Sequence, residues 1–437
     1  MIRDSSRDSF PVSGSFIESV ESTSGARRGP AGSDARKAPV HGRGRAAGGL
    51  VALGAVLALG AATAAPAQAQ GGAQVVESEH YTFRVVTVAD GLQHPWSIAF
   101  LPNGDMLITE RPGRLRIVRN GKLLPDPVPG VPPVRAQGQG GLLDVVPHPD
   151  FANNRLLYLT YSKPNEDGSE ATTAVARAKF ENDRLTDLEE IFVAQAWSRG
   201  GNHFGSRLVF DGKGHILITV GDRAARPELE TAERHPAQLL TNHQGTVIRL
   251  YEDGRVPEDN PFVGRSDALP EIWSYGHRNP QGLALHPETG DLWLNEHGPQ
   301  GGDELNLVRP GLNYGWPVIG YGVQYGGSII HRGTAQEGME QPVHYWVPSI
   351  ATSGLMIYTG DKFPAWRGNI FVGGLAGQQL ARLTMDGQRV VAEETLLRGI
   401  GRIRDVRQGP DGYIYLAIDD RPGGLTPVVR LEPIPGF

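Results

Sequence analysis

The chain has 437 residues, of which 58 are glycine and 33 are proline, and it carries a formal net charge of −6 at pH 7. An acidic chain of this kind is a poor partner for nucleic acid or anionic lipid. The sequence contains no cysteine, which excludes disulfide bonds and the Cys-x-x-Cys-His attachment of a c-type haem. A hydrophobic content of 39% is ample for a globular core, and the many glycines and prolines favour a loop-rich β protein.

Residues 1–69 predict a disordered tail followed by a signal peptide. Residues 1–46 are polar, rich in Arg, Ser and Gly, and without periodicity. Arg43 and Arg45 then precede an apolar run over 46–65 and the Ala-Gln-Ala sequence at 67–69. This order is typical of a bacterial signal peptide; a membrane anchor is the alternative, but the run is short and rich in Ala and Gly. We therefore expect a periplasmic or secreted mature protein without a stable membrane span, starting near Gln70.

Loss of residues 1–69 would remove eight basic and five acidic residues and take the formal charge to about −9. Residues 70–84 are expected to form a short linker, and residues 85–437 the folded domain. The oligomeric state is left open between monomer and dimer.

A turn rich in Pro, Asp, Asn and Gly, followed by β-branched or aromatic residues, recurs six times in the expected domain. The six turns begin at Pro102, Pro149, Asp211, Pro287, Pro364 and Pro410. Each predicts a tight turn into a strand, and a spacing of roughly 40–75 residues is typical of propeller blades. No long stretch has helical periodicity. The pattern predicts an all-β protein with the fold of a six-bladed β-propeller, and a β-sandwich is the alternative.

His203 is the candidate catalytic base. It lies in the segment 198–223, among glycines and at the edge of a short apolar strand, where its imidazole could face a ligand. The alternative is a structural histidine held by hydrogen bonds, and for His277 and His297 we keep that alternative. Gln139, in a glycine-flanked loop, could reach the same ligand or cap a turn.

The region 275–314 is dense in groups that bind anions and cations. Arg278 and Asn279 place a guanidinium beside an amide, and a guanidinium suits carboxylates and quinone oxygens. Gly298 and Pro299 form a turn that exposes backbone carbonyls near acidic side chains, the oxygen ligands that Ca²⁺ prefers. A solvated acidic loop is the alternative. Further along, Arg402 and Arg404 alternate on a predicted strand, so that both would share one face and either meet solvent or receive an anion.

Several blocks in this order resemble the soluble sugar dehydrogenases that depend on pyrroloquinoline quinone (PQQ), in particular the aldose sugar dehydrogenase branch of the glucose/sorbosone dehydrogenase family. The resemblance spans about Val85 to Glu432. Its markers are Gly138-Gln-Gly-Gly-Leu-Leu, Gly201-Asn-His-Phe-Gly, Gly276-His-Arg-Asn-Pro-Gln-Gly, Glu296-His-Gly-Pro, Asn313-Tyr-Gly-Trp-Pro and Arg402-Ile-Arg-Asp-Val. The family is a six-bladed propeller, in agreement with the six turns.

The resemblance implies roles for individual residues. His203 would take the proton of the anomeric hydroxyl of an aldose as hydride passes to C5 of the quinone, which yields a lactone. The carbonyls of Gly298 and Pro299 would hold the Ca²⁺ that polarises the quinone, and Glu304 with the carbonyl of Tyr314 would form a second, structural calcium site. The residues that would contact PQQ are Gln139, Arg278, Asn279, Tyr325, Leu375, Ala376, Arg402 and Arg404.

Two positions depart from the family pattern. Familiar relatives carry a lysine that contacts the cofactor where this chain has Ala376, so one charge contact is missing unless Arg382 or another cation substitutes. Asn202 stands where glucose-oxidising members carry aspartate, which weakens the inference that glucose is the substrate.

Two other functions remain open: a calcium-dependent propeller hydrolase or lactonase, and a non-catalytic binding propeller. PQQ carries three carboxylates, which require cations. The three arginines Arg278, Arg402 and Arg404 therefore favour the quinone enzyme, because a hydrolase has no evident need of them. Without a haem motif, a separate electron acceptor is required.

Overall fold

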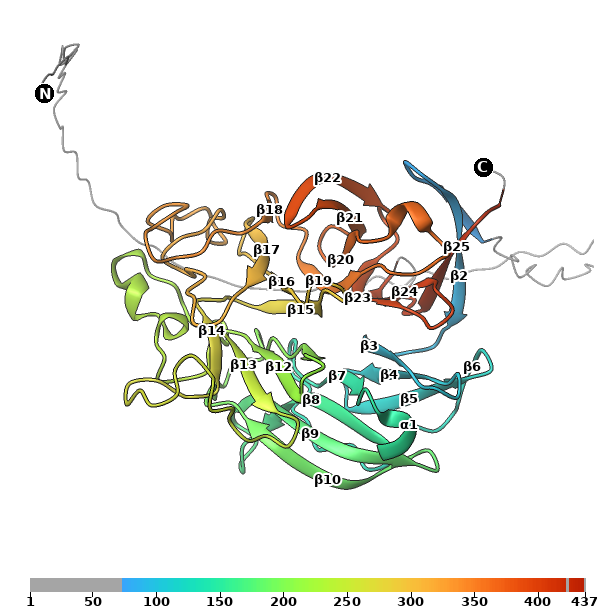
Figure 1. Ribbon diagram of the computed structural model, residues 1–437, viewed down its shortest axis with the longest axis horizontal. Coiled ribbons are helices and arrows are strands. Elements are labelled where there is room, and N and C mark those ends of the chain that lie inside the picture. The colour runs from blue at the N-terminus through green and yellow to red at the C-terminus, as the bar shows by residue number, and fades with distance from the viewer. Residues whose placement is uncertain (1–72, 422–423, 436–437) are drawn as a thin grey trace, which may run out of the picture. The chain divides into compact units, whose positions relative to one another are not determined.

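The computed structural model describes residues 73–421 and 424–435, and the predicted tail, signal peptide and cleavage site lie outside them. The described chain folds into six small antiparallel sheets (Figure 1). Its helical part is one turn of α-helix, α1 (Phe151–Asn154), with the short 3₁₀ segments η1 (Leu229–Arg234), η2 (Pro236–Gln238) and η3 (Pro364–Trp366). None of the helices in these residues is long and apolar enough to cross a membrane.

The first five sheets are four-stranded blades. Blade 1 contains β3 (Pro95–Phe100), β4 (Met106–Glu110), β5 (Arg114–Arg119) and β6 (Lys122–Leu123). Blade 2 contains β7 (Leu142–Pro147), β8 (Leu156–Pro164), β9 (Ala171–Glu181) and β10 (Arg184–Val193). Blade 3 contains β11 (Leu208–Phe210), β12 (His215–Val220), β13 (Thr246–Tyr251) and β14 (Ile272–Tyr275). Blade 4 contains β15 (Pro280–Leu285), β16 (Leu292–Glu296), β17 (Asp303–Val308) and β18 (His344–Trp346). Blade 5 contains β19 (Thr352–Ile357), β20 (Ile370–Gly374), β21 (Gln379–Asp386) and β22 (Arg389–Leu396).

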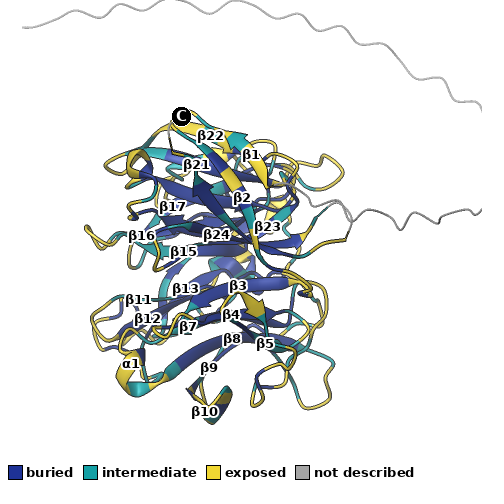
Figure 2. Cartoon of the chain, turned by 90° about the vertical axis from the view of Figure 1, so that its right-hand side faces the viewer, coloured by how far each residue is buried: buried dark blue, intermediate teal, exposed yellow. Residues whose placement is uncertain are grey.

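The first strands of the blades close a ring. Strand β3 contacts β7, and the contacts continue through β11, β15 and β19 to the first strand of blade 6, β23 (Arg402–Gln408), which returns to β3. These strands are largely buried, whereas the outer strands β10 and β22 carry many exposed residues (Figure 2). The predicted six-bladed β-propeller is therefore confirmed.

Each of the six predicted turns leads into the second strand of its own blade: β4, β8, β12, β16, β20 and β24 (Ile414–Asp420). In blades 2 and 5 a short helical segment, α1 or η3, intervenes between the turn and the strand. Positive φ explains the glycine in the first turn, because Gly104 has φ 88°. The repeat seen in the sequence is thus the turn between the two innermost strands of a blade.

Blade 6 is built from both ends of the described chain. Its order is β23, β24, β25 (Val428–Pro433), β2 (Thr82–Ala89) and β1 (Gln74–Glu77). Strand β2 pairs with β25, Arg84 forms an ion pair with Glu432 at 2.7 Å, and Phe83 is fully buried. The expectation that residues 70–84 form a linker is therefore wrong for residues 74–77 and 82–84, which are paired strands of blade 6. The period-two burial of β2 anchors this segment in the sheet.

Hydrophobic side chains fill each of the six seams between neighbouring blades. Leu107 and Leu159 lie in the seam of blades 1 and 2, and Ile218 lies in the seam of blades 2 and 3. The seam that closes the ring, between blades 6 and 1, contains Ile98 and Val428. The remaining three seams have clusters of the same kind. Burial of apolar surface between blades is the general source of stability in this fold.

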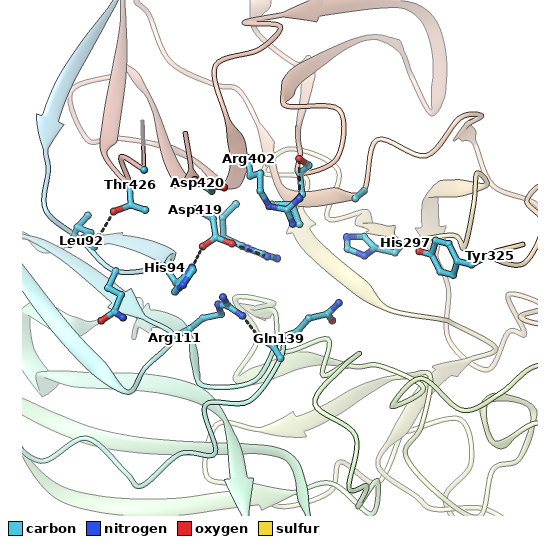
Figure 3. A pocket seen from close by; sticks show the side chains of 16 residues that line it. Leu92, His94, Arg111, Gln139, His297, Tyr325, Arg402, Asp419, Asp420 and Thr426 are labelled. Atoms are coloured by element: carbon cyan, nitrogen blue, oxygen red, sulfur yellow. Dashed lines mark hydrogen bonds and ion pairs between the residues drawn. The ribbon is translucent and has the colours of Figure 1, made fainter. Parts of the chain in front are cut away.

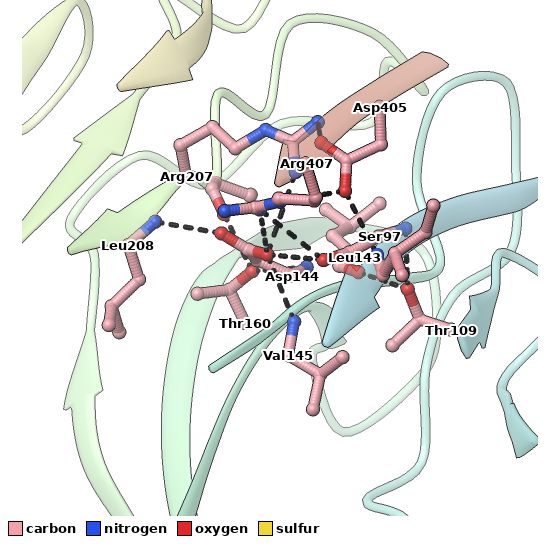
Figure 4. A network of polar contacts seen from close by, with 12 residues as sticks. Ser97, Thr109, Leu143, Asp144, Val145, Thr160, Arg207, Leu208, Asp405 and Arg407 are labelled. Carbon is pink, nitrogen blue, oxygen red and sulfur yellow. Dashed lines mark hydrogen bonds and ion pairs between the residues drawn. The ribbon is translucent and has the colours of Figure 1, made fainter. Parts of the chain in front are cut away.

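A network of buried charges lies among the inner strands (Figure 4). The guanidinium of Arg207, just before β11, is 3.0 Å from Asp405 of β23 and 3.5 Å from Asp144 of β7. Arg407 of β23 pairs with the same two carboxylates, at 3.1 Å to Asp144 and 2.9 Å to Asp405. Ser97 of β3 donates a hydrogen bond to Asp144 at 2.6 Å. Two cations and two carboxylates thus join blades 2, 3 and 6 with balanced charge, and Ser97 links blade 1 to them.

We expect Asp144→Ala to destabilise the protein by about 3–5 kcal/mol, because removing one partner leaves buried arginine charge uncompensated. Asp253→Ala is the matched control: its partner Arg255 is 72% exposed, so water replaces the lost pairing. Urea unfolding of both variants measures the two losses. Equal, small losses would contradict a structural role for the network.

Candidate active site

A cavity of about 650 Å³ opens among the loops at one end of the blades (Figure 3). It collects residues from distant parts of the chain, because the loops that follow β4, β16 and β20 meet the loop before β7 and the strands β23 and β24. The predicted site residues that line it are Gln139, Tyr325, Leu375, Arg402 and Arg404. Tyr325 lies at the rim, with 68% of its surface exposed.

Arg402 and Arg404 both line the cavity, as expected for alternate residues of one strand. Arg402 donates to the carbonyl of Leu375 at 3.4 Å. Arg404 is buried, donates to Gln281 at 3.0 Å and lies 3.4 Å from Asp419. Burial lowers the pKa of Arg404 to about 10, the charge of Asp419 opposes this, and neighbouring arginines add to it. An excess of positive charge therefore faces this cavity.

His203 is buried in the loop before β11, with its backbone in the left-handed region at φ 54°. Its amide donates to Gln139 at 2.9 Å, and its Nδ1 lies 2.6 Å from Oδ1 of Asp222. A side chain at Gly221 would clash with the carbonyl of His203, so the glycine permits this close approach. When Asp222 accepts the Nδ1 proton, the lone pair of Nε2 is left available to a ligand.

The electrostatics of His203 favour the neutral imidazole. Burial lowers the pKa of His203 below its ordinary value, and the charges of Arg278 and Arg223 act in the same direction. The carboxylate of Asp222 partly offsets this by stabilising the protonated form. A neutral imidazole in a fixed tautomer is the state that a general base requires.

Asn279 completes a polar layer around His203. Asn279 is fully buried; its amide group lies 3.5 Å from Oε1 of Gln139, and its Oδ1 accepts from the amide of Gly205 at 3.3 Å. Gln139 thus connects His203 and Asn279 to the cavity that it lines. The sequence prediction that these three residues share one site agrees with their positions.

The four residues predicted to bind calcium surround one small cavity of about 10 Å³, which is close to the room that a single water or ion needs. Gly298, Pro299, Glu304 and Tyr314 all line it. The described residues hold no group of three or more His, Cys, Asp or Glu side chains that could bind a metal, so a cation here would need other oxygen ligands, such as backbone carbonyls, besides carboxylates.

The chemistry at this small cavity fits one cation on the Glu304 side. Burial, followed by the neighbouring charge of Glu296, raises the pKa of Glu304 to about 8. Oδ1 of Asn306, beside them, is buried without a hydrogen-bond partner in the structure. The carbonyl of Gly298, by contrast, already accepts a hydrogen bond from Arg278 at 2.8 Å. A cation at that carbonyl would have to share it with the guanidinium.

Neither Ala376 nor Arg382 lines the cavity. Ala376 is exposed next to Leu375 and is not among the described residues that line the cavity. Arg382, considered as a replacement for the missing lysine, is buried in blade 5, where it pairs with Glu79 and Glu394 at 2.7 Å each. Arg382 therefore does not supply the cavity with charge.

Sequence reasoning missed several residues at the site. Asp222 lies two residues after the end of β12, and its pairing with His203 depends on how the loops fold. Arg111, His94 and Asp419 line the cavity, yet they lie in turns or strand ends without a distinctive motif, and His297 lines it from within the Glu296-His-Gly-Pro block. His297 is partly buried, with a buried Nε2 that has no hydrogen-bond partner in the structure, and desolvation lowers its pKa well below the ordinary value. The sequence reasoning had kept His297 as a structural residue.

Comparison with known proteins gives consistent matches. The family described as Glucose / Sorbosone dehydrogenase matches residues 92–427. The aldose sugar dehydrogenase YliI of Escherichia coli is 47% identical over 353 residues, which covers 79% of this chain and 93% of that protein. The apo-form crystal structure of the soluble aldose sugar dehydrogenase from E. coli has a TM-score of 0.74 and 44% identity, covering 80% of this chain and all of that one. The PQQ-bound aldose sugar dehydrogenase of Streptomyces coelicolor has a TM-score of 0.64 and 28% identity, covering 80% and 98%.

The lowered pKa of His203 predicts that its imidazole is protonated only at a pH below the ordinary range of histidine. The neutral imidazole stabilises the fold fully above the unfolded-state pKa of about 6.5, and this contribution is lost as the pH falls below that value. Histidine NMR, assigned with His203→Ala, should give a midpoint below 6.5, and Asp222→Asn should lower it further because a negative neighbour is removed. A midpoint at or above 6.5 would show that Asp222 outweighs burial.

Proposed function

Since the chain belongs to the glucose/sorbosone dehydrogenase family, we propose that it oxidises aldose sugars at the anomeric carbon to lactones, with PQQ as cofactor and calcium as metal. The comparisons confirm the family and the oxidoreductase class that the motifs predict. The PQQ-bound structure of the S. coelicolor relative supports the choice of cofactor.

The observation that carries the proposal is the pairing of His203 with Asp222 beside an arginine-lined cavity. Asp222 holds the imidazole in one tautomer at 2.6 Å, and burial keeps it neutral. In this state Nε2 can take the proton of the anomeric hydroxyl as hydride leaves the carbon. Proton removal makes hydride departure feasible, so a positioned base is the group that the reaction needs most.

The cavity fits a planar tricarboxylate. Arg402 and Arg404 line it, and Nε of Arg404 is buried without a hydrogen-bond partner in the structure. Arginine binds carboxylates through a planar fork of donors. Burial lowers the pKa of Arg404 most, and an anion here would relieve the repulsion between arginines that adds to this shift. When bound, PQQ accepts the hydride and calcium polarises its quinone. Gln139 and Asn279 would orient the cofactor beside His203.

One assay distinguishes a quinone enzyme from a hydrolase and from a binding propeller. PQQ and calcium are added to the purified protein, and reduction of an artificial electron-accepting dye is followed with a series of aldoses. A quinone enzyme reduces the dye only when PQQ, calcium and sugar are all present. Lactone hydrolysis without PQQ, or sugar binding without dye reduction, would support the other two functions. Since the chain has no cysteine to attach a haem, its electrons pass to a separate acceptor.

His203→Ala should lower kcat by about 10²–10⁴-fold, the usual contribution of a positioned general base, and leave PQQ binding largely intact. Arg278→Ala is the contrast, since loss of a cation should raise the Kd for PQQ first. PQQ binding is titrated by absorbance, and turnover is then measured at saturating dye. A His203→Ala variant with normal PQQ binding and near wild-type kcat would remove His203 from the mechanism.

Calcium removal should lower the Tm as well as abolish activity. A ligand that binds only the folded state at a hundredfold excess over its Kd stabilises by about 2.7 kcal/mol. Chelated protein is melted with and without added calcium, and Glu304→Gln is the matched variant, in which the calcium-dependent gain in Tm should shrink. An unchanged Tm together with full activity of the chelated protein would contradict the calcium assignment.

Export is predicted from the basic, apolar and Ala-x-Ala order that ends at Ala69. Expression in a bacterial host should yield a periplasmic product that starts near Gln70, as determined by N-terminal sequencing. An intact Met1 on a cytoplasmic product would show that this segment does not direct export.

A further inference from the structure

We propose that Arg111 is a further cofactor-binding residue, whose guanidinium holds a carboxylate of PQQ from the side of the cavity opposite Arg402. The inference rests on the proposed function and adds a residue that the family motifs do not include. Figure 3 shows Arg111 and Gln139 on one side of the cavity and Arg402 and Asp419 on the other.

The backbone of Arg111 is fixed, so its side chain has a defined origin. The amide of Arg111 donates to the carbonyl of His94 at 3.1 Å, and its own carbonyl accepts from the amide of Leu142 at 3.1 Å. A side chain at Gly141 would clash with the Arg111 carbonyl, so the two segments pack without space between them. One terminal nitrogen of the guanidinium donates to the carbonyl of Gly138. Such preorganisation reduces the entropy that a ligand contact would cost.

The guanidinium of Arg111 has unused donors. Its Nε is buried and has no hydrogen-bond partner in the structure, and no carboxylate of the described residues lies within 4.0 Å of it. The next arginines of the same hairpin behave differently, since Arg114 and Arg116 both pair with Glu110, at 2.6 and 3.3 Å. A buried arginine donor without an anion is costly unless a ligand completes it.

The charges around Arg111 are unbalanced toward positive. The arginines Arg111, Arg402 and Arg404 line the cavity with two carboxylates, Asp419 and Asp420, and that of Asp419 is shared between Arg404 and His94, at 3.4 and 2.7 Å. The charge of Arg111 also contributes to the lowered pKa of Arg404, which indicates that the two guanidinium groups feel one another. A ligand with several carboxylates would neutralise this cluster from within the cavity.

Arg111 supplies a positive charge in place of the lysine that familiar relatives carry at the position of Ala376. Arg382 is committed to Glu79 and Glu394 away from the cavity, so it cannot take that role. Arg111 and Arg402 are the two cavity-lining arginines without an ion pair among the described residues, and of the two only Arg111 lies outside the family motifs.

The test is Arg111→Gln, titrated with PQQ in the presence of calcium. We expect the Kd to rise about 10- to 100-fold, the usual effect of losing a hydrogen bond between charged groups. The Tm of the apoprotein should stay unchanged or rise, because a like charge is removed from the cluster. Lys122→Gln is the matched control: it removes one cation from the exposed β6 of the same blade and should leave the Kd unchanged.

Salt dependence separates a charge contact from a structural effect. Wild-type PQQ binding should weaken steeply with added salt, and the slope should be shallower in Arg111→Gln. The double variant Arg111→Gln with Ala376→Lys adds a cation next to Leu375, which lines the cavity, and should recover part of the affinity and of the slope. An unchanged Kd, or a raised Kd with the wild-type slope, would overturn the proposal. If the wild-type protein does not bind PQQ, the proposed function fails instead, so the two failures are distinguishable.

Discussion

The pairing of β2 with β25 is the constraint on which the rest of the structure depends, because it joins the two ends of the described chain into one blade. Blade 6 carries Arg402 and Arg404, whereas Arg111 and Gln139 come from the loops of blades 1 and 2. These residues face one cavity only when the ring is closed. The seam between blades 6 and 1, packed by Ile98 and Val428, therefore holds the arginines of blade 6 close to the loops of blades 1 and 2.

Buried charged residues form two kinds of cluster in this propeller. In the network of Arg207, Arg407, Asp144 and Asp405, cations and carboxylates balance, so the group ties strands together without need of a ligand. At the cavity the arginines outnumber their carboxylate partners. Buried charges of opposite sign in equal number hold the strands in place. Where buried arginines exceed carboxylates, their mutual repulsion remains, and an anionic ligand can relieve it. The excess of positive charge thus distinguishes a binding site from a structural network of the same residue types.

The repeated turns were sufficient to predict the blades, because each turn has a local signal and each blade one such turn. The closing strand β2 was not predicted: the copies of the repeat start at Pro102, and pairing between residues 83 and 433 has no local signal. The site shows the same division. The motif residues Gln139, Arg402 and Arg404 line the cavity, while Asp222 and Arg111 reach the site through loop geometry that spacing does not encode.

The closing blade also sets an order on folding. Strand β2 is among the first strands of the described chain to be synthesised, yet its partner β25 is among the last, so contacts such as that of Phe83 with Pro433 wait for almost the whole chain. Contacts of such sequence separation carry a large loop-closure entropy and slow the final step. Until β25 is synthesised, five blades can form, but blade 6 cannot bring its side of the cavity next to the loops of blades 1 and 2. A ligand that contacts residues of both blade 6 and blades 1 and 2 can therefore bind only late, to a chain that has completed its ring.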